Sequence, residues 1–529
     1  MPVANDTDYF AFRPNGAWDL QREPPAWLGE SESLRQVVAD LVPRLTQRRA
    51  FPPLRRFFQA SWHLGSALLL WRLRERRHGG QRSRSGLSRR LRDAFEILGP
   101  PYIKLGQILS SGRGLFPDEL VAEFRTLRDQ VRPEPFSAVR RVVEGDLGHP
   151  LDELFSEFAS RPLAAASIAQ VHAARLRTGE EVVVKVQRPQ VAELVRKDIA
   201  AMAWIAPFLV GRIPVAALAN PPALVELFAQ TILEELDFRL EAQNMLDIAA
   251  LLARSGQRTL WVPRPHPRLV TRRVLVMEHL PGLPYERVED VRAAGVDTSA
   301  LLRTLIVVLL EGAMVHGVFH GDLHGGNLAI TPEGQIVLFD YGITARMREP
   351  ERLAFLRLMM LGMVGNVRGQ IEAYKELGAL APDTDVDELI RKLKLDQPVV
   401  DPASLSPEQL TREIQYVTKT LLGYGARLPK PLLLFVKNLI FLDDAIAHLA
   451  PDVNIFAEMM RIYAYFAATH GERIAAEIGL DPAQHSFDVD AFKAGLGLRP
   501  EVETLTHRDL QRRRAIIRRK LEEASRSTD

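Results

Sequence analysis

The residues with the clearest chemical potential lie between positions 320 and 342. The run His320-Gly321-Asp322-Leu323-His324-Gly325-Gly326-Asn327 is followed, after a predicted β-hairpin, by Phe339-Asp340-Tyr341-Gly342. Phosphoryl transfer needs a carboxylate that orients the acceptor and oxygen ligands for Mg²⁺. Asp322 and Asn327 have the spacing of a phosphoryl-transfer catalytic loop. We therefore predict Asp322 as catalytic and Asn327 and Asp340 as metal ligands, against the alternative of two ordinary turns.

A zinc site is a second interpretation of the same segment. His316, His320 and His324 recur at every fourth position, and histidines at this spacing on a helix can bind zinc. Four glycines between and after them disfavour one continuous helix. We therefore expect His320 to stiffen the loop around Asp322.

A lysine at the end of an apolar strand is the second signal. Lys185 follows Val182-Val183-Val184, and an ammonium in that position can contact the α- and β-phosphates of a nucleotide. The predicted helix 233–245 carries Asp237 and Glu241 four residues apart, and like charges at this spacing repel unless a cation compensates. We predict Glu241 as the partner of Lys185, whereas a solvated acidic face is the simpler alternative.

Small residues mark the strand before Lys185. The run Ala164-Ala165-Ala166-Ser167 stands where a glycine-rich loop would cover phosphates. Alanine still allows close approach of the backbone, although it is stiffer than glycine. We predict that these four residues contact nucleotide, together with the backbone around Met277 and Glu278 at the end of another short strand, 274–277.

The elements that must position these residues form an α+β pattern. Strands are predicted at 167–175 and 181–186 around the turn 177–180, and a hairpin joins 328–330 to 335–339. Apolar residues recur at helical spacing over 222–253 and over most of the remaining chain, which predicts helices there. We expect two lobes, a small sheet lobe with additional helices and a helical lobe, with nucleotide between them.

Composition narrows the class of protein. Of 529 residues, 68 are Lys or Arg and 66 are Asp or Glu, which gives a net charge of +2. This balance disfavours general nucleic-acid binding, and the lack of cysteine excludes disulfides and thiolate metal sites. The polar N-terminus shows no secretory signal. We expect a cytoplasmic protein.

Nine arginines between positions 72 and 92 face a single acid. Because glycines and serines lie among them, we predict a flexible basic linker. The preceding apolar run 60–71, which includes Trp62 and Trp71, is too short to span about 30 Å of hydrocarbon, and a second run, 431–442, is interrupted by Lys437. The first run suits the interface of an anionic membrane; a core-packed helix is the equal alternative.

Taken in order, these motifs resemble the UbiB (ABC1/ADCK) family of atypical kinases over roughly residues 95–456. Lys104-Leu105-Gly106-Gln107 is similar to the K-x-G-Q signature of that family, and Glu235-Leu236-Asp237 to its E-x-D signature. The alanine run, Asp322, Asn327 and Asp340 fall on further family positions, and Glu241 falls on the ion-pair glutamate.

The resemblance implies a two-lobed, protein-kinase-like fold with additional N-terminal and N-lobe helices, ATP or ADP and Mg²⁺ as cofactors, and lipid-stimulated ATPase activity in prenyl-lipid or isoprenoid-quinone metabolism. It also implies that Lys104, Gln107, Glu235 and Asp237 are regulatory, because the K-x-G-Q helix packs over the active site in this family. Many members of the family end in transmembrane helices, which we do not expect here, so we expect peripheral contact with the inner face of a membrane.

Three departures from the family pattern affect nucleotide fit and rate. Val183 replaces the usual alanine under the adenine, Leu323 and Gly325 alter the catalytic loop, and Tyr341 replaces the phenylalanine of the D-F-G triplet. None of these departures removes a charged catalytic group.

The expected organisation has five parts: an N-terminal extension with basic linker at 1–93, the K-x-G-Q helical extension at 94–160, an N-lobe at 161–280, a C-lobe at 281–475 and a basic tail at 476–529. A prenyl or anionic lipid is the expected partner besides nucleotide, and a homodimer is left open. A non-catalytic, nucleotide-gated lipid scaffold and a kinase for small molecules or proteins remain alternatives.

Overall fold

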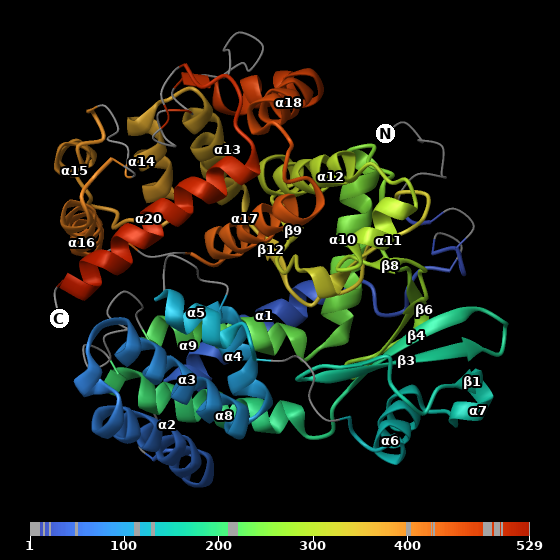
Figure 1. The fold of residues 1–529 in the computed structure, drawn as a ribbon. Helices are drawn as coiled ribbons and strands as arrows, with labels where there is room; N and C mark the ends of the chain where they lie inside the picture. Colours follow the sequence, from blue (N-terminus) through green and yellow to red (C-terminus); the bar gives the residue numbers. More distant parts are fainter. Residues whose placement is uncertain are drawn as a thin grey trace. The chain divides into compact units, whose positions relative to one another are not determined.

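The structure is a computed structural model, and it places most of the chain in two compact units (Figure 1). Unit 1 comprises Met1–Arg254, Leu260–Gly282 and Val337–Ile343, and unit 2 comprises Ser255–Thr259, Leu283–Ile336 and Thr344–Asp529. The described residues are 11–13, 16–20, 23–47, 51–110, 117–127, 133–209, 221–397, 402, 404–424, 426, 429–479, 489–490, 493, 498 and 501–527.

Unit 1 contains the sheet that carries Lys185. Its strands are β1 (Phe155–Phe158), β2 (Ala164–Ala165), β3 (Ala169–Leu176), β4 (Glu181–Gln187), β6 (Pro265–Val270) and β7 (Val274–Glu278). They run in the order β1-β3-β4-β7-β6 with antiparallel neighbours, and β2 pairs with β3. The three strands predicted at 167–175, 181–186 and 274–277 are confirmed.

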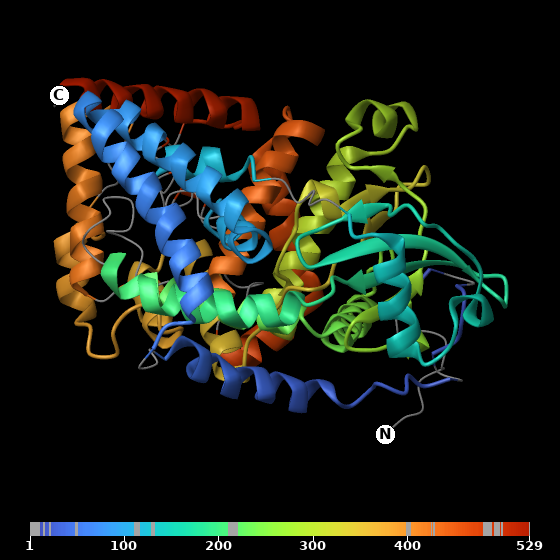
Figure 2. The ribbon, with the colours of Figure 1, turned by 90° about the horizontal axis from the view of Figure 1, so that it is seen from below.

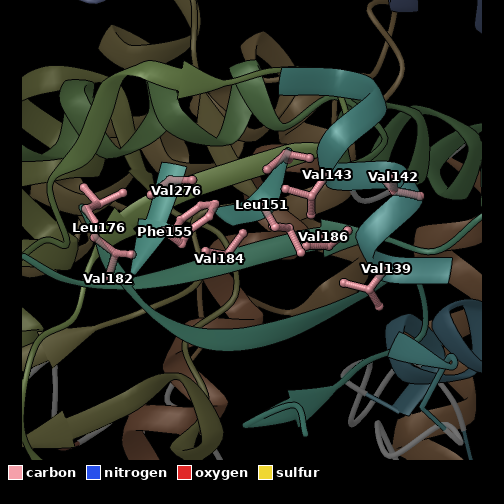
Figure 3. Packing of buried hydrophobic residues seen from close by; sticks show 11 residues of the cluster. Val139, Val142, Val143, Leu151, Phe155, Leu176, Val182, Val184, Val186 and Val276 are labelled. Atoms are coloured by element: carbon pink, nitrogen blue, oxygen red, sulfur yellow. The ribbon is translucent and has the colours of Figure 1, made fainter. Parts of the chain in front are cut away.

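One face of this sheet is covered by helix α6 (Phe136–Leu147). Figure 3 shows Val139 and Val143 of α6 beside the sheet, where they pack with Val182, Val184 and Val186 of β4. Because side chains alternate along a strand, this packing sends Val183 and Lys185 to the opposite face. The apolar core thus fixes the direction in which Lys185 points.

The helices of unit 1 precede and follow these strands. Their bounds are α1 (Ser31–Thr46), α2 (Leu54–Arg74), η1 (Arg76–His78), α3 (Gly80–Leu98), α4 (Pro100–Ser110), α5 (Asp118–Phe124), α7 (Leu151–Leu154), α8 (Val191–Leu209), α9 (Pro221–Glu235) and α10 (Phe238–Arg254). Figures 1 and 2 show α1 beside α8 and α9, with which it is in contact. The short strand β5 (Leu260–Trp261) follows α10.

Two expectations about these helices are wrong. The predicted flexible linker at 72–92 is instead the end of α2, the turn η1 and most of α3. Arg90 makes this possible, since it binds Glu75 with Nη2–Oε1 2.6 Å and ties α3 to the end of α2. The predicted helix 233–245 breaks at Leu236 and Asp237, so Asp237 and Glu241 do not share one helical face.

Unit 2 is mainly helical and holds the catalytic-loop segment. Its strands are β8 (Leu283–Pro284), β9 (Val318–His320), β10 (Leu328–Ile330) and β12 (Thr344–Arg346), and β11 (Ile336–Leu338) continues into unit 1. β9 pairs with β12 and β10 pairs with β8, both antiparallel. The loop with Asp322 lies between β9 and β10. The strands expected at 328–330 and 335–339 are confirmed as β10 and β11.

The helices of unit 2 surround these strands. They are α11 (Val288–Ala293), α12 (Thr298–Leu310), η3 (Glu311–His316), η4 (Gly325–Asn327), α13 (Glu349–Met363), α14 (Val367–Glu376), α15 (Val386–Leu393), α16 (Pro407–Gly423), α17 (Lys430–Leu449), α18 (Ile455–Ile478) and α20 (His507–Ser527).

Among the residues that the structure describes, one helix is long and apolar enough to cross a membrane by length and composition alone. It covers Thr298–His316, with mean hydropathy 1.7, and 56% of it is buried inside the structure. A core helix of a globular unit meets the same test. Glu311 within it is fully buried, where its Oε1 lies 2.9 Å from His470 Nε2, so this helix has polar as well as apolar contacts inside unit 2.

Candidate functional site

Lys185 and Glu241 form the centre of the candidate site in unit 1. Lys185 Nζ donates to both carboxylate oxygens of Glu241, at 2.7 and 2.9 Å, and lies 3.3 Å from Asp340 Oδ2. Both Lys185 and Glu241 are buried, and the ammonium also lies 5.5 Å from the ring centre of Phe238. Glu241 is thus confirmed as the contact of Lys185 that was expected from the sequence.

Burial and neighbouring charge act in opposite directions on this pair. Burial disfavours the charged lysine, but Asp340 and Glu241 outweigh it and raise the pKa of Lys185. Burial raises the pKa of Glu241 to about 7, although the Lys185 ammonium partly offsets this effect. Lys185 therefore remains a cation, available to an anionic phosphate.

Asp340 is held by its own turn and by α10. Its Oδ1 accepts the N–H of Gly342 at 2.9 Å, and Asn244 Nδ2 of α10 donates to the carbonyl of Tyr341 at 2.8 Å. The Asp340 side chain is 45% exposed, whereas Tyr341 is fully buried. The turn therefore anchors Tyr341 in the core and leaves a carboxylate accessible, as a metal ligand requires.

The alanine-rich segment is anchored to the end of β4. Arg188 donates through Nε to the carbonyl of Ala166 at 2.9 Å and pairs with Glu134 at 2.9 Å. Ala164 is exposed, Ala165 and Ala166 are half-buried, and Ser167 is buried. Arg188 was not predicted from the sequence, because an arginine two positions beyond the end of a strand motif is common in loops.

The segment predicted to meet adenine lies on β7 beside β4. Met277 is opposite Val183 in the register, and the N–H of Glu278 donates to the carbonyl of Arg264 at 2.9 Å. The buried Glu278 carboxylate lies 2.8 Å from Nη2 of Arg13. This contact of an N-terminal residue with β7 had no signal in the sequence, since nothing in the pattern joins positions 13 and 278.

The four residues predicted to be regulatory do not all share one contact. Lys104 of α4 lies 3.0 Å from Glu235 Oε1 at the end of α9, so the structure brings these two residues together. Asp237 instead binds Arg239, with Nη2–Oδ2 2.8 Å. Gln107 accepts Ser110 Oγ at its carbonyl, 2.8 Å away.

Close packing explains why a glycine, Gly106, lies between Lys104 and Gln107. A Cβ there would lie 2.2 Å from Leu127 Cδ1 and 3.3 Å from Phe95 Cδ2. A larger residue would require the Leu127 side chain to move, so the glycine allows α4, which carries Lys104, to pack closely against Leu127 and Phe95.

The catalytic-loop segment of unit 2 is organised around Asp322. His320 Nδ1 accepts the N–H of Asp322 at 3.1 Å, and Asn327 Nδ2 donates to the carbonyl of Asp322 at 3.2 Å. Lys437 of α17 donates to Asp322 Oδ1. The imidazole of His320 is therefore used inside the loop, as expected.

Asn438, the next residue of α17, binds the backbone of the same loop through its side-chain amide. Its Oδ1 accepts the N–H of Leu323 at 3.0 Å, and its Nδ2 donates to the carbonyl of His320. Neither the role of Lys437 nor that of Asn438 was predicted from the sequence, in which Lys437 only interrupts an apolar run. A charge and an amide side by side in an otherwise apolar helix were the available signal.

Two of the three histidines considered as a zinc site have separate contacts. His316 Nε2 lies 3.1 Å from Ser255 Oγ, whereas His320 binds the loop backbone. Within the part of the chain that the structure describes, no group of three or more His, Asp or Glu side chains is arranged to hold a metal ion. The described geometry therefore gives no support to zinc.

Comparisons with known proteins identify the family of this chain. Residues 126–373 match the model of the ABC1 atypical kinase-like domain. A probable protein kinase UbiB from Aeromonas hydrophila is 30% identical over 380 residues, covering 70% of this chain and 69% of that protein. An uncharacterized Mycobacterium tuberculosis protein is 33% identical over 399 residues, covering 71% and 77%.

A solved structure is also similar. The complex of Rv3197 with erythromycin from Mycobacterium tuberculosis has 26% sequence identity and a TM-score of 0.36, covering 62% of this chain and 89% of that chain.

The α+β fold and the sequence matches define an atypical kinase-like protein. The chain belongs to the ABC1 (UbiB) family. The resemblance predicted from the sequence motifs is confirmed, and with it the kinase-like fold class.

Proposed function

We propose that this chain binds MgATP and transfers or hydrolyses its terminal phosphate as a UbiB-type atypical kinase or ATPase. The observation that carries the proposal is the Lys185 ammonium, bound by both oxygens of Glu241 and 3.3 Å from Asp340. A buried ammonium fixed between two carboxylates is suited to position phosphate oxygens.

The roles follow the chemistry of each side chain. Lys185 binds the α- and β-phosphates, and Glu241 keeps it in place. Ala164 to Ser167 lie along the nucleotide, with Met277 and Glu278 at the adenine. Asp322 orients the attacking water or hydroxyl, and His320 and Asn327 hold its loop.

The donor set fits magnesium. Asp340 offers a half-exposed carboxylate and Asn327 an amide oxygen, and Mg²⁺ in such sites is bound by one or two protein oxygens together with phosphates and water. When bound, it neutralises charge on the phosphates during transfer. We assign Asn327 and Asp340 as its protein ligands.

We place this activity in prenyl-lipid or isoprenoid-quinone metabolism, with peripheral contact to an anionic membrane from the cytoplasmic side. Support comes from the family and from α2, on which Trp62 and Leu69 are exposed at 73% and 57%. Lys104, Gln107, Glu235 and Asp237 are assigned to regulation, with the Lys104–Glu235 ion pair as its physical element.

Phosphate release from MgATP tests the proposal, for the native chain and Asp340→Asn, with and without vesicles that contain anionic lipid. We expect release that rises with vesicles and falls at least about 100-fold in Asp340→Asn, because one metal ligand loses its charge. Nucleotide binding with no release in any condition would favour the lipid scaffold. Release that is unchanged in Asp340→Asn would contradict the assigned mechanism.

A further inference from the structure

An apolar cavity lies among the helices of unit 1 that precede and follow the sheet. Its volume is about 160 Å³, and its lining comes from α2, α3, α4, α5, α8 and α9. The lining residues include Leu64, Leu68, Leu105, Met202, Ala206 and Val225. An apolar cavity of about 150 Å³ stays dry and accepts a nonpolar ligand of benzene size. None of the residues assigned above to nucleotide or metal lines this cavity.

One wall of the cavity, α2, has two different apolar faces. Leu64 and Leu68 line the cavity, whereas Phe58, Trp62 and Leu73 are 63%, 73% and 63% exposed. A row of large exposed apolar side chains on one helix face marks an interaction surface. Both faces therefore present hydrocarbon, one inward to the cavity and one outward.

Cations lie at the end of the same helix. Arg72, Arg74, Arg76 and Arg77 are all exposed, directly after the row of apolar residues. Aromatic and leucine side chains beside a basic cluster are suited to the interface of an anionic bilayer. We therefore take an anionic lipid as the partner of this surface. Its hydrocarbon chains match the apolar residues of α2, and its anionic headgroups match the arginines that follow them.

Tyr102 is a further residue of the cavity lining. It is 2% exposed, and its hydroxyl has no hydrogen-bond partner among the residues that the structure describes. A buried hydroxyl without a partner costs on the order of 1–3 kcal/mol.

We propose that this cavity binds the terminal hydrocarbon segment of one acyl chain of a membrane lipid, supplied from an anionic bilayer at the outer face of α2. The inference adds a ligand site to the lipid-responsive activity proposed above, and lipid binding can be measured without turnover. Two helices that line the cavity, α4 and α9, also carry Lys104 and Glu235. Chain binding therefore acts on helices joined by that ion pair.

The test uses cis-parinaric acid, a fatty acid whose fluorescence rises in apolar surroundings, with the full-length protein. Ala206→Phe fills the cavity from a position that is 3% exposed. We expect at least about 10-fold weaker binding of the probe with an unchanged or higher melting temperature, since filling a cavity stabilises. Leu64→Trp, at a half-buried position, is the second filling variant if Ala206→Phe does not fold.

Leu69→Ser is the matched control, because Leu69 is exposed on α2 and does not line the cavity. It should keep probe affinity and lose binding to phosphatidylglycerol vesicles. Those vesicles should also compete with the probe in the native protein. Native-like probe binding by the two folded filling variants, or no probe binding by the native protein, would overturn the proposal.

MgATP binding measured in the same preparations separates the two proposals. Loss of probe binding with intact nucleotide binding rejects only the lipid site, whereas the reverse result rejects the proposed function.

Discussion

Lys437 of α17 contacts Asp322 of the catalytic loop, although 115 residues separate them in the sequence. The two side chains are similarly buried, 19% and 18% exposed. Asn438 binds the loop backbone on both sides of Asp322, at His320 and Leu323. One turn of α17 thus supplies both the charge partner of the predicted catalytic carboxylate and the support of its loop.

Replacing Lys437 by methionine should lower turnover more than substrate affinity. The variant keeps the length of the side chain but removes the cation beside Asp322, so we expect kcat to fall at least about 10-fold with KM within about 2-fold. Steady-state phosphate release measures both. Lys392→Met is the control, because Lys392 is exposed and pairs with Glu388 on the surface. A native kcat in Lys437→Met would show that the contact does not serve the reaction.

Replacing Asn438 by leucine should destabilise the protein. The change leaves the N–H of Leu323 and the carbonyl of His320 without their partner, inside a fully buried site. We expect a loss of about 2–4 kcal/mol in the free energy of unfolding, measured by denaturant titration. A loss below about 0.5 kcal/mol would mean that other groups hold the loop.

Replacing Lys185 by methionine should weaken nucleotide binding and stability together. Glu241 would keep a buried carboxylate without its cation, which typically costs about 3–5 kcal/mol. The double variant Lys185→Met with Glu241→Met should recover most of this stability, because both charges are gone, but should not recover MgATP affinity. Calorimetric titration and thermal unfolding give the two readouts. Recovery of nucleotide affinity in the double variant would contradict a role for the ammonium.

Breaking the Lys104–Glu235 ion pair should change regulation. We expect Lys104→Met to lower stability by about 1 kcal/mol and to raise phosphate release without lipid, since α4 loses its tie to α9. Arg90→Met is a matched control, because it breaks the Arg90–Glu75 ion pair of similar exposure, 19% and 16%. Equal effects of both variants on turnover would assign Lys104 a structural role only.

His266 should make the stability of unit 1 depend on pH. Burial lowers the pKa of His266 to about 4, and its Nδ1 accepts the N–H of Arg268 and Leu269, both at 3.1 Å. The unfolded chain gains its proton near pH 6.5, before the folded chain does, so stability is lost as pH falls from about 6.5 towards 4.

The expected loss from this residue between pH 7 and pH 5 is about 2 kcal/mol. His266→Asn keeps an acceptor for the two N–H groups and removes the titration. The native protein should therefore lose about 2 kcal/mol more of its unfolding free energy than the variant does between pH 7 and pH 5. Parallel pH profiles would show that His266 does not contribute.

The sequence predicted those features that depend on local pattern. Short strand-forming runs beside turn residues identified β3, β4 and β7, and the spacing of Asp322, Asn327 and Asp340 identified the kinase-like loops. Lys185 and Glu241 lie 56 residues apart, and their pairing was expected only because a buried lysine needs a carboxylate partner and the family supplies one.

The features that were missed depend on long-range packing. Arg13 meets Glu278, and Lys437 meets Asp322, through contacts that no local period encodes. The prediction of a linker in the arginine-rich segment is wrong because composition alone does not reveal long-range contacts. The Arg90–Glu75 ion pair and the Trp71 Nε1 contact with Ser83, at 3.0 Å to its carbonyl, hold α2 and α3 together. The prediction of one helix over 233–245 is wrong because local propensity does not reveal the break at Leu236 and Asp237.

Calorimetric titration of ADP with and without Mg²⁺, for the native protein and Asp340→Asn, tests the central assignment most directly. The Lys185–Glu241–Asp340 arrangement predicts that Mg²⁺ strengthens ADP binding at least about 10-fold in the native protein and that this gain disappears in Asp340→Asn. The same Mg²⁺ gain in both proteins would contradict Asp340 as a metal ligand and with it the proposed phosphoryl-transfer site.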